Sequence, residues 1–153
     1  DGEGLPTRRN QVIDRGRLAT YLLDSYSARK LAGTSTGNAA RGPGSPPTVA
    51  PTNLWLEPGR GTLDELVAST ERGLLVTELI GMGFHPVTGD YSRGVAGLWI
   101  ERGEVVHPVE EVTIAGNLGD MLGQVDSVAD DLVWLGRVAS PSLRVARMTI
   151  AGE

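Results

Sequence analysis

The sequence contains no cysteine, which excludes a disulfide scaffold, a cysteine nucleophile and thiolate metal ligands. No apolar run reaches the roughly 18 residues that a membrane-spanning helix needs, so we expect no segment to span a bilayer. Basic residues are the minority, 14 against 19 acidic ones, and the net charge is -5. Nucleic acids and anionic membranes both select basic surfaces, so neither is expected as a partner.

Glycine is abundant, with 21 of 153 residues, and it shows no collagen-like period. This composition favours turns and short strands over long helices. We predict a single domain over residues 1–153, with an α+β, mostly-β fold. An antiparallel or mixed sheet, half-barrel-like, would carry about three short helices. The chain opens on Asp1 without an initiator methionine, so we expect it to be a fragment of a longer protein.

Two segments predict β-hairpins with matching turns. Residues 12–13 and 17–23 flank the turn Asp14-Arg15-Gly16, and residues 98–100 and 105–106 flank Glu101-Arg102-Gly103. A short polar turn with glycine between apolar runs is typical of a hairpin. Residues 111–115 and two later segments, 132–135 and 143–150, predict further strands.

Helix signals occur at three places. Residues 25–32 predict a helix that Ser25 caps and Gly33 ends. Residues 62–65 fit a capping box, for a helix that Gly73 would end. A third short helix, through residues 120–122, would start at Asn117 or at Gly119. Residues 74–80 predict a central strand, and residues 34–52 a long loop.

The pattern Gly-x-Ser-x-Gly at residues 33–37 raises the possibility of a serine hydrolase that uses Ser35. Its context is a helix followed by a loop, the reverse of a nucleophile elbow, so a glycine-rich loop whose hydroxyls bond its own backbone is the better interpretation. His85 and His107 are the only histidines and lack the spacing of a zinc helix. We therefore predict no metal site, and His85, on a glycine-rich loop, is the better functional candidate.

Two clusters of charged residues are most simply interpreted as solvent-exposed. The acidic group contains Glu101, Glu104, Glu110 and Glu111, and the basic group contains Arg8, Arg9, Arg15 and Arg17. The first suits a solvated hairpin face, and the second suits protection of a strand edge. The three tryptophans lie within apolar runs and predict packing positions.

Several strings, in order along nearly the whole chain, resemble the C-terminal region of the TldD/PmbA family, in its PmbA (TldE) branch. These strings cover residues 21–24, 28–31, 35–39, 77–81, 86–94, 108–118, 130–132 and 140–143. Each string alone has little specificity, but the ordered set is specific.

The resemblance implies a cytoplasmic TldD–TldE assembly that degrades or processes unfolded peptides. TldD-like chains hold a catalytic metal, expected to be zinc, with a His-Glu-x-x-x-His helix and a later cysteine. This chain has neither, so the resemblance implies a non-catalytic subunit, no cofactor of its own and a TldD-like partner in a heterodimer. The family is also described as a modulator of DNA gyrase, which leaves a regulatory module without proteolysis as the alternative.

No catalytic residue is carried over from the family. Glycine-rich loops beside strand edges suit the main-chain binding of an extended peptide, which is largely independent of sequence. We therefore predict that two loops contact the peptide or the partner subunit. A homodimer of this chain is a further possibility. The predicted contact residues are Gly33, Thr34, Ser35, Thr36, Gly37, Asn38, His85, Gly89, Asp90, Tyr91, Ser92, Arg93 and Gly94.

Overall fold

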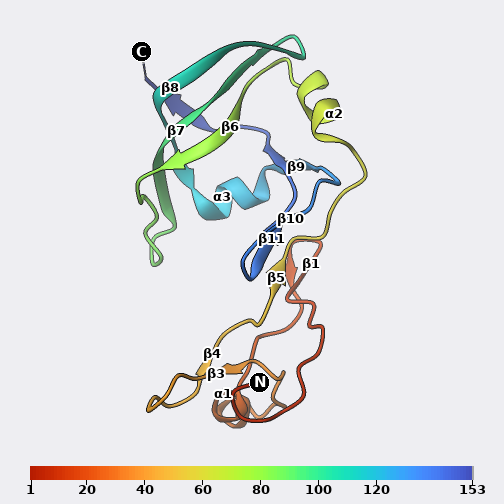
Figure 1. Ribbon diagram of the computed structural model, residues 1–153, viewed down its shortest axis with the longest axis vertical. Coiled ribbons are helices and arrows are strands. Elements are labelled where there is room, and N and C mark those ends of the chain that lie inside the picture. Colours follow the sequence, from red (N-terminus) through yellow and green to blue (C-terminus); the bar gives the residue numbers. More distant parts are fainter. Residues whose placement is uncertain (153) are drawn as a thin grey trace. The chain divides into compact units, whose positions relative to one another are not determined.

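The computed structural model describes residues 1–152 (Figure 1). These residues group into two compact units, the first made of residues 1–55 with 135–139 and the second of residues 56–134 with 140 onward. Across the described residues the chain is mostly strand with three short helices and open sheets, which confirms the predicted fold class. The single domain over residues 1–153 stays a prediction. No helix of the described residues is long and apolar enough to cross a membrane.

The first unit consists of short strand pairs and one helix. The pairs are β1 (Ile13–Asp14) with β2 (Arg17–Leu18), β3 (Ala39–Ala40) with β4 (Thr48–Val49), and β5 (Leu54–Trp55) in parallel with β11 (Val138–Ser140). The predicted first hairpin is thus confirmed, with shorter strands than expected. Residues 34–52 are not a continuous loop, because β3 and β4 pair within them.

Helix α1 (Ser25–Lys30) begins at Ser25, the residue that was predicted to be its N-cap. Asp24, not Ser25, is the N-cap, and its carboxylate accepts a 2.6 Å hydrogen bond from the Ser27 N–H. This backbone hydrogen bond lowers the pKa of Asp24. The helix is also not ended by a left-handed Gly33, because Ala32 takes the positive φ of 51°.

The second unit contains a four-stranded antiparallel sheet. Its order is β13 (Thr149–Ala151), β8 (Glu104–Asn117), β7 (Asp90–Glu101) and β6 (Arg72–Ile80). Residues 74–80 therefore form an edge strand, and the prediction of a central strand is wrong. A long apolar run suits an edge strand as well as a central strand. β6 is an edge strand because β7, its one neighbour in this sheet, pairs with β8 on its other side.

The core of the second unit lies on one face of this sheet. Val95, Val112 and Ile114 are buried there, and partly buried side chains of β6 pack against them. Residues 111–115 are not a separate strand, because β8 continues through a register shift at which Glu111 has a positive φ of 58°. Such a bulge lets one strand supply both the hairpin and the core.

Helix α2 (Leu63–Ala68) has the predicted capping box. The Glu65 N–H donates to the Thr62 hydroxyl, and the Glu65 carboxylate accepts from the Thr62 N–H. Gly73 does not end this helix, because Ser69 is its C-cap and Gly73 already belongs to β6. The third predicted helix is confirmed as α3 (Leu118–Gly123) with Asn117 as N-cap.

The remaining strands follow α3. β9 (Val125–Val128) pairs antiparallel with β12 (Leu143–Val145), and β10 (Val133–Leu135) precedes β11. Arg144 of β12 donates to the Asp126 carboxylate at 2.8 Å, and this hydrogen bond lowers the pKa of Asp126. Residues 143–150 were expected as one strand and instead form β12 and β13.

Candidate functional site

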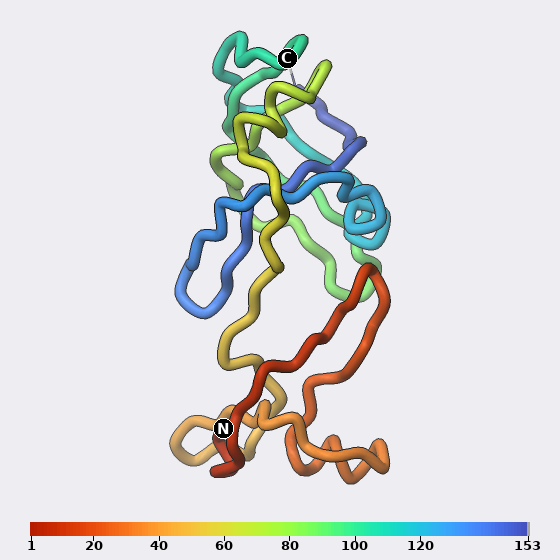
Figure 2. Tube along the Cα trace, turned by 90° about the vertical axis from the view of Figure 1, so that its right-hand side faces the viewer, coloured from red at the N-terminus to blue at the C-terminus, as the bar shows by residue number. Residues whose placement is uncertain are grey.

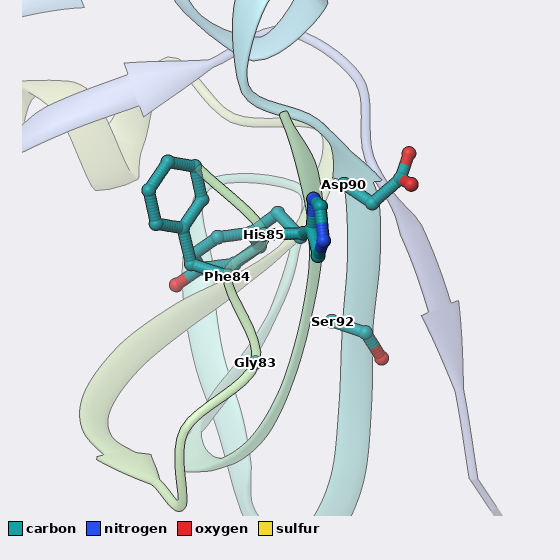
Figure 3. Close-up of a pocket in the computed structure, with 6 residues that line it drawn as sticks. Gly83, Phe84, His85, Asp90 and Ser92 are labelled. Atoms are coloured by element: carbon teal, nitrogen blue, oxygen red, sulfur yellow. The ribbon is translucent and has the colours of Figure 1, made fainter. Parts of the chain in front are cut away.

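The connection between β6 and β7 forms a hollow of about 340 Å³ in the second unit (Figure 3). The chain reverses here through an isolated bridge between Phe84 and Tyr91 and a hydrogen bond from the Ser92 N–H to the Gly83 carbonyl. The hollow is lined by Gly83, Phe84, His85, Asp90, Tyr91 and Ser92. It therefore brings together four of the predicted contact residues, which are His85, Asp90, Tyr91 and Ser92.

The imidazole of His85 is oriented by Thr88. The Thr88 N–H donates to His85 Nδ1 at 3.2 Å, and the Thr88 hydroxyl lies 3.1 Å from the same nitrogen. That hydroxyl donates to the Asp90 carboxylate at 2.7 Å. Because a backbone N–H can only donate, Nδ1 accepts and the neutral ring carries its proton on Nε2. His85 can thus donate the N–H of its Nε2 to a peptide carbonyl. Figure 3 shows that the His85 ring lies apart from the Phe84 ring.

Asn117 holds this loop against the start of α3. Its Nδ2 donates to the Thr88 carbonyl at 2.8 Å, while its Oδ1 accepts from the Gly119 N–H at 3.0 Å. Gly89 has a positive φ of 78°, and a Cβ added there would lie 3.1 Å from the Asn117 amide nitrogen. Thr88 and Asn117 were not among the predicted site residues. The sequence shows Asn117 only as a helix start, because its second hydrogen bond joins residues 29 positions apart.

Replacement of Asn117 by alanine is expected to loosen this loop while the sheet stays folded. The change removes the bond to Thr88 and the α3 cap together, at a cost of about 1–2 kcal/mol in the free energy of unfolding. Amide exchange of residues 85–90 in the full-length protein should quicken more than that of the β7 core. Asn53→Ala, at an exposed position of the first unit, is the control. Unchanged exchange at 85–90 would contradict the positioning role of Asn117.

Arg93 and Asp90 have different partners in the structure. Asp90 accepts from Thr88, whereas Arg93 Nη2 donates to the carbonyls of Leu79 and Gly81, where β6 ends. The Nε of Arg93 is buried, and among residues 1–152 it has no hydrogen-bond partner. Arg93 therefore supports the end of the edge strand rather than an ion pair with Asp90.

The other predicted contact loop, residues 33–38 of the first unit, is partly internal. Thr36 and Asn38 are only 6% and 7% exposed. The Thr36 hydroxyl donates to the Leu23 carbonyl at 3.1 Å, and the Asn38 amide oxygen accepts from Asn10 at 3.1 Å. Gly33 and Thr34 are exposed, so they are the members that a peptide or partner can reach without rearrangement.

The hydroxyl of Ser35 is engaged by the backbone of its own unit. It donates to the Leu23 carbonyl at 3.2 Å and accepts from the Gly37 N–H at 3.2 Å. This is the arrangement that the glycine-rich loop interpretation predicts. A serine nucleophile instead needs its hydroxyl bonded to a general base. The geometry thus gives no support to a hydrolase that uses Ser35.

The described residues do not fit a zinc ion. Within residues 1–152, no three His, Cys, Asp or Glu side chains gather closely enough to hold a metal. His85 Nδ1 is occupied by the Thr88 N–H, and its neighbour Asp90 is bonded to the Thr88 hydroxyl. Structural and catalytic zinc sites use three or four protein ligands, so this pair alone is not such a site.

Comparisons with known proteins agree on one family. The family model of the PmbA/TldA metallopeptidase C-terminal domain matches residues 1–152. Metalloprotease PmbA of Escherichia coli O157:H7 is 41% identical over 100% of this chain and 32% of its own length. A TldD homologue of Buchnera aphidicola (strain APS) is 26% identical over 99% of this chain and 35% of its own length. The chain thus spans about a third of these relatives.

Solved structures show the same relationship. A Thermotoga maritima protein, proposed to modulate a DNA gyrase, superposes with a TM-score of 0.91 at 35% identity, over 99% of this chain and 35% of its own. TldE from Thermococcus kodakarensis superposes with a TM-score of 0.87 at 28% identity, over 98% of this chain and 35% of its own. The predicted family is therefore confirmed: the chain belongs to the PmbA/TldA metallopeptidase family, as a C-terminal domain.

Proposed function

We propose that this chain is the C-terminal domain of a non-catalytic, PmbA/TldE-like subunit of a cytoplasmic peptidase that processes unfolded peptides. The zinc of this assembly would belong to a TldD-like partner subunit. The observation that carries the proposal is the difference in similarity to two proteins of one organism, Buchnera aphidicola (strain APS), over essentially the whole chain. The identity is 34% to its PmbA homologue and 26% to its TldD homologue. The lack of any cysteine in the sequence supports it.

The second unit offers main-chain hydrogen bonds to an extended peptide. β6 pairs with β7 on one side, and among the described residues no strand pairs with it on the other. Unpaired N–H and C=O groups of an edge strand bind extended chains regardless of their sequence. The hollow at the end of β6 adds the Nε2–H of His85 as a further donor.

Peptide cleavage by the full-length protein, alone and with its TldD-like partner, tests the proposal. We expect no cleavage of an unfolded peptide by the protein alone, cleavage when the partner is added, and loss of cleavage with a chelator. Ser35→Ala should leave the activity of the pair intact. Chelator-resistant cleavage by the protein alone, abolished by Ser35→Ala, would instead establish a serine hydrolase and refute the proposal.

The second candidate is a module that regulates DNA gyrase without proteolysis. It is favoured by the similarity to the Thermotoga maritima protein that is proposed to modulate a DNA gyrase. A supercoiling assay with purified gyrase separates the two. A change in supercoiling rate at equimolar full-length protein, with no peptide cleavage in any pairing, would favour this candidate.

A further inference from the structure

The last four residues of β6 are exposed on both faces of the sheet. Thr77, Glu78, Leu79 and Ile80 are all exposed, whereas residues 73–76 are half-buried. A strand with one packed face normally alternates between buried and exposed side chains. The unbroken exposure therefore shows that, within residues 1–152, both faces of this strand end are largely uncovered. Its outer edge is also free, because β7 is its one neighbour among the described strands.

The register of the sheet assigns these side chains to opposite faces. Leu79 is paired with the core residue Val95, so Leu79 lies on the core face. Glu78 and Ile80 are two positions apart, so they lie together on the other face. A peptide that added to this edge would place one side chain beside each of the three β6 residues, at the distance of a cross-strand pair.

Exposed apolar side chains continue beyond the end of β6. Leu79 and Ile80 are 44% and 49% exposed, and on the following loop Met82 is fully exposed and Phe84 is 50% exposed. Phe84 also lines the hollow. Figures 1 and 2 show the green connection between β6 and β7 as a loop that extends away from the strands. A run of exposed apolar side chains beside a free strand edge marks an interaction site.

The charge of this region indicates which peptides it would accept. The second unit carries six basic and 15 acidic residues, a net charge of -9. Glu78 forms no ion pair with any described residue. Arg93, paired with Ile114 of the core, lies on the opposite face and donates to backbone carbonyls. Glu78 is thus an exposed, unneutralised charge that attracts a basic side chain and repels an acidic one.

We propose that the end of β6 selects extended peptides in which a basic residue is followed or preceded by two apolar residues. This inference rests on the proposed function and adds a sequence preference to it. The basic side chain lies beside Glu78, and the apolar side chains lie beside Leu79 and Ile80. Because Arg93 already donates to the carbonyls of Leu79 and Gly81, side chains supply part of the contact here. An extended peptide uses the free edge, the apolar side chains and the carboxylate together.

Peptide binding to the full-length protein, followed by fluorescence anisotropy, tests the charge preference. The probes are short unstructured peptides that contain Lys-Leu-Leu or Glu-Leu-Leu and are otherwise identical. We expect the lysine peptide to bind about fivefold or more tightly at low salt, since attraction replaces repulsion, and this ratio should fall as salt is added. Glu78→Gln should reduce the ratio to about twofold. The control Glu110→Gln, an equal change of charge on exposed β8, should leave the ratio unchanged.

The apolar part of the preference needs a second pair of variants. Leu79→Thr with Ile80→Thr keeps side chains that suit a strand but removes apolar contact, and it should weaken binding of the lysine peptide about threefold or more. The control is Val105→Thr with Val106→Thr. These valines are neighbours on β8, 47% and 55% exposed, so the same loss of apolar surface occurs away from the β6 edge. The control should bind as wild type does.

Three results would overturn the preference: no binding of either peptide, equal affinity for both, or an unchanged ratio in Glu78→Gln. So would full protection of the amides of residues 77–80 from exchange before peptide is added, because the protein's own chain then covers this strand end. The cleavage assay separates the two proposals. Equal cleavage of both peptides with a TldD-like subunit would retain the proposed function and reject the preference. Charge-dependent binding without cleavage in any pairing would retain the preference and reject the peptidase.

Discussion

Replacement of Val95 by aspartate is expected to unfold the second unit. Val95 is 0% exposed and lies between Leu79 of β6 and Val112 of β8 in the sheet register. A carboxylate there would lose its hydration and gain no partner, which costs several kcal/mol, about as much as the roughly 5–15 kcal/mol that stabilises a whole domain. Urea unfolding of the full-length protein, followed by circular dichroism, should show a lost or strongly shifted transition.

The matched control for Val95→Asp is Val87→Asp. Val87 lies on the loop between β6 and β7 and is 87% exposed, so the same substitution removes almost no buried apolar surface. Its unfolding midpoint should stay near that of wild type, within about 0.5 kcal/mol. If the two variants unfolded alike, Val95 would not be a core residue and the assigned register of β7 would be incorrect.

Replacement of Gly103 by alanine is expected to destabilise the β7–β8 hairpin. Gly103 has a positive φ of 79°, and an added Cβ would collide with the carbonyl oxygen of Ala68 at the end of α2. A residue with a side chain loses about 1 kcal/mol of stability in this left-handed backbone conformation. The backbone shift that relieves the collision costs about 1–3 kcal/mol more. Thermal unfolding should report a total loss of about 2–4 kcal/mol.

The first hairpin provides the control for this substitution. Gly16 follows Arg15 as Gly103 follows Arg102, and it has nearly the same φ of 77°, but no atom lies within 4 Å of a Cβ placed there. Gly16→Ala should therefore cost only the backbone part, about 1 kcal/mol. Equal losses at the two glycines would show that the contact with Ala68 contributes nothing.

The local features of the fold could be predicted from the sequence. Both hairpin turns have positive φ at two consecutive residues, Arg15-Gly16 and Arg102-Gly103, the geometry that favours glycine at the second position. The capping box at Thr62 and the helix start at Asn117 are also present. Each is made by residues within a few positions of one another, so the sequence pattern contains all of the participants.

The candidate site was predictable only in part. The sequence indicates His85 and its glycine-rich loop, and the structure adds the hollow around it. It does not indicate Thr88 and Asn117 as the residues that orient the loop, nor the carbonyls of Leu79 and Gly81 as partners of Arg93. Those contacts depend on how β6, β7 and α3 pack, which involves residues that are distant along the chain.

The sequence by itself determined the family, the mostly-β composition, the two hairpin turns and the capping box at Thr62, because these depend on residue order and on hydrogen bonds within single turns. Tertiary structure alone decided that β6 is an edge strand and that Thr36 and Asn38 are internal. It also decided which charged residues share a unit. Strand order and burial arise from contacts between distant segments, and a local sequence pattern is compatible with several such arrangements.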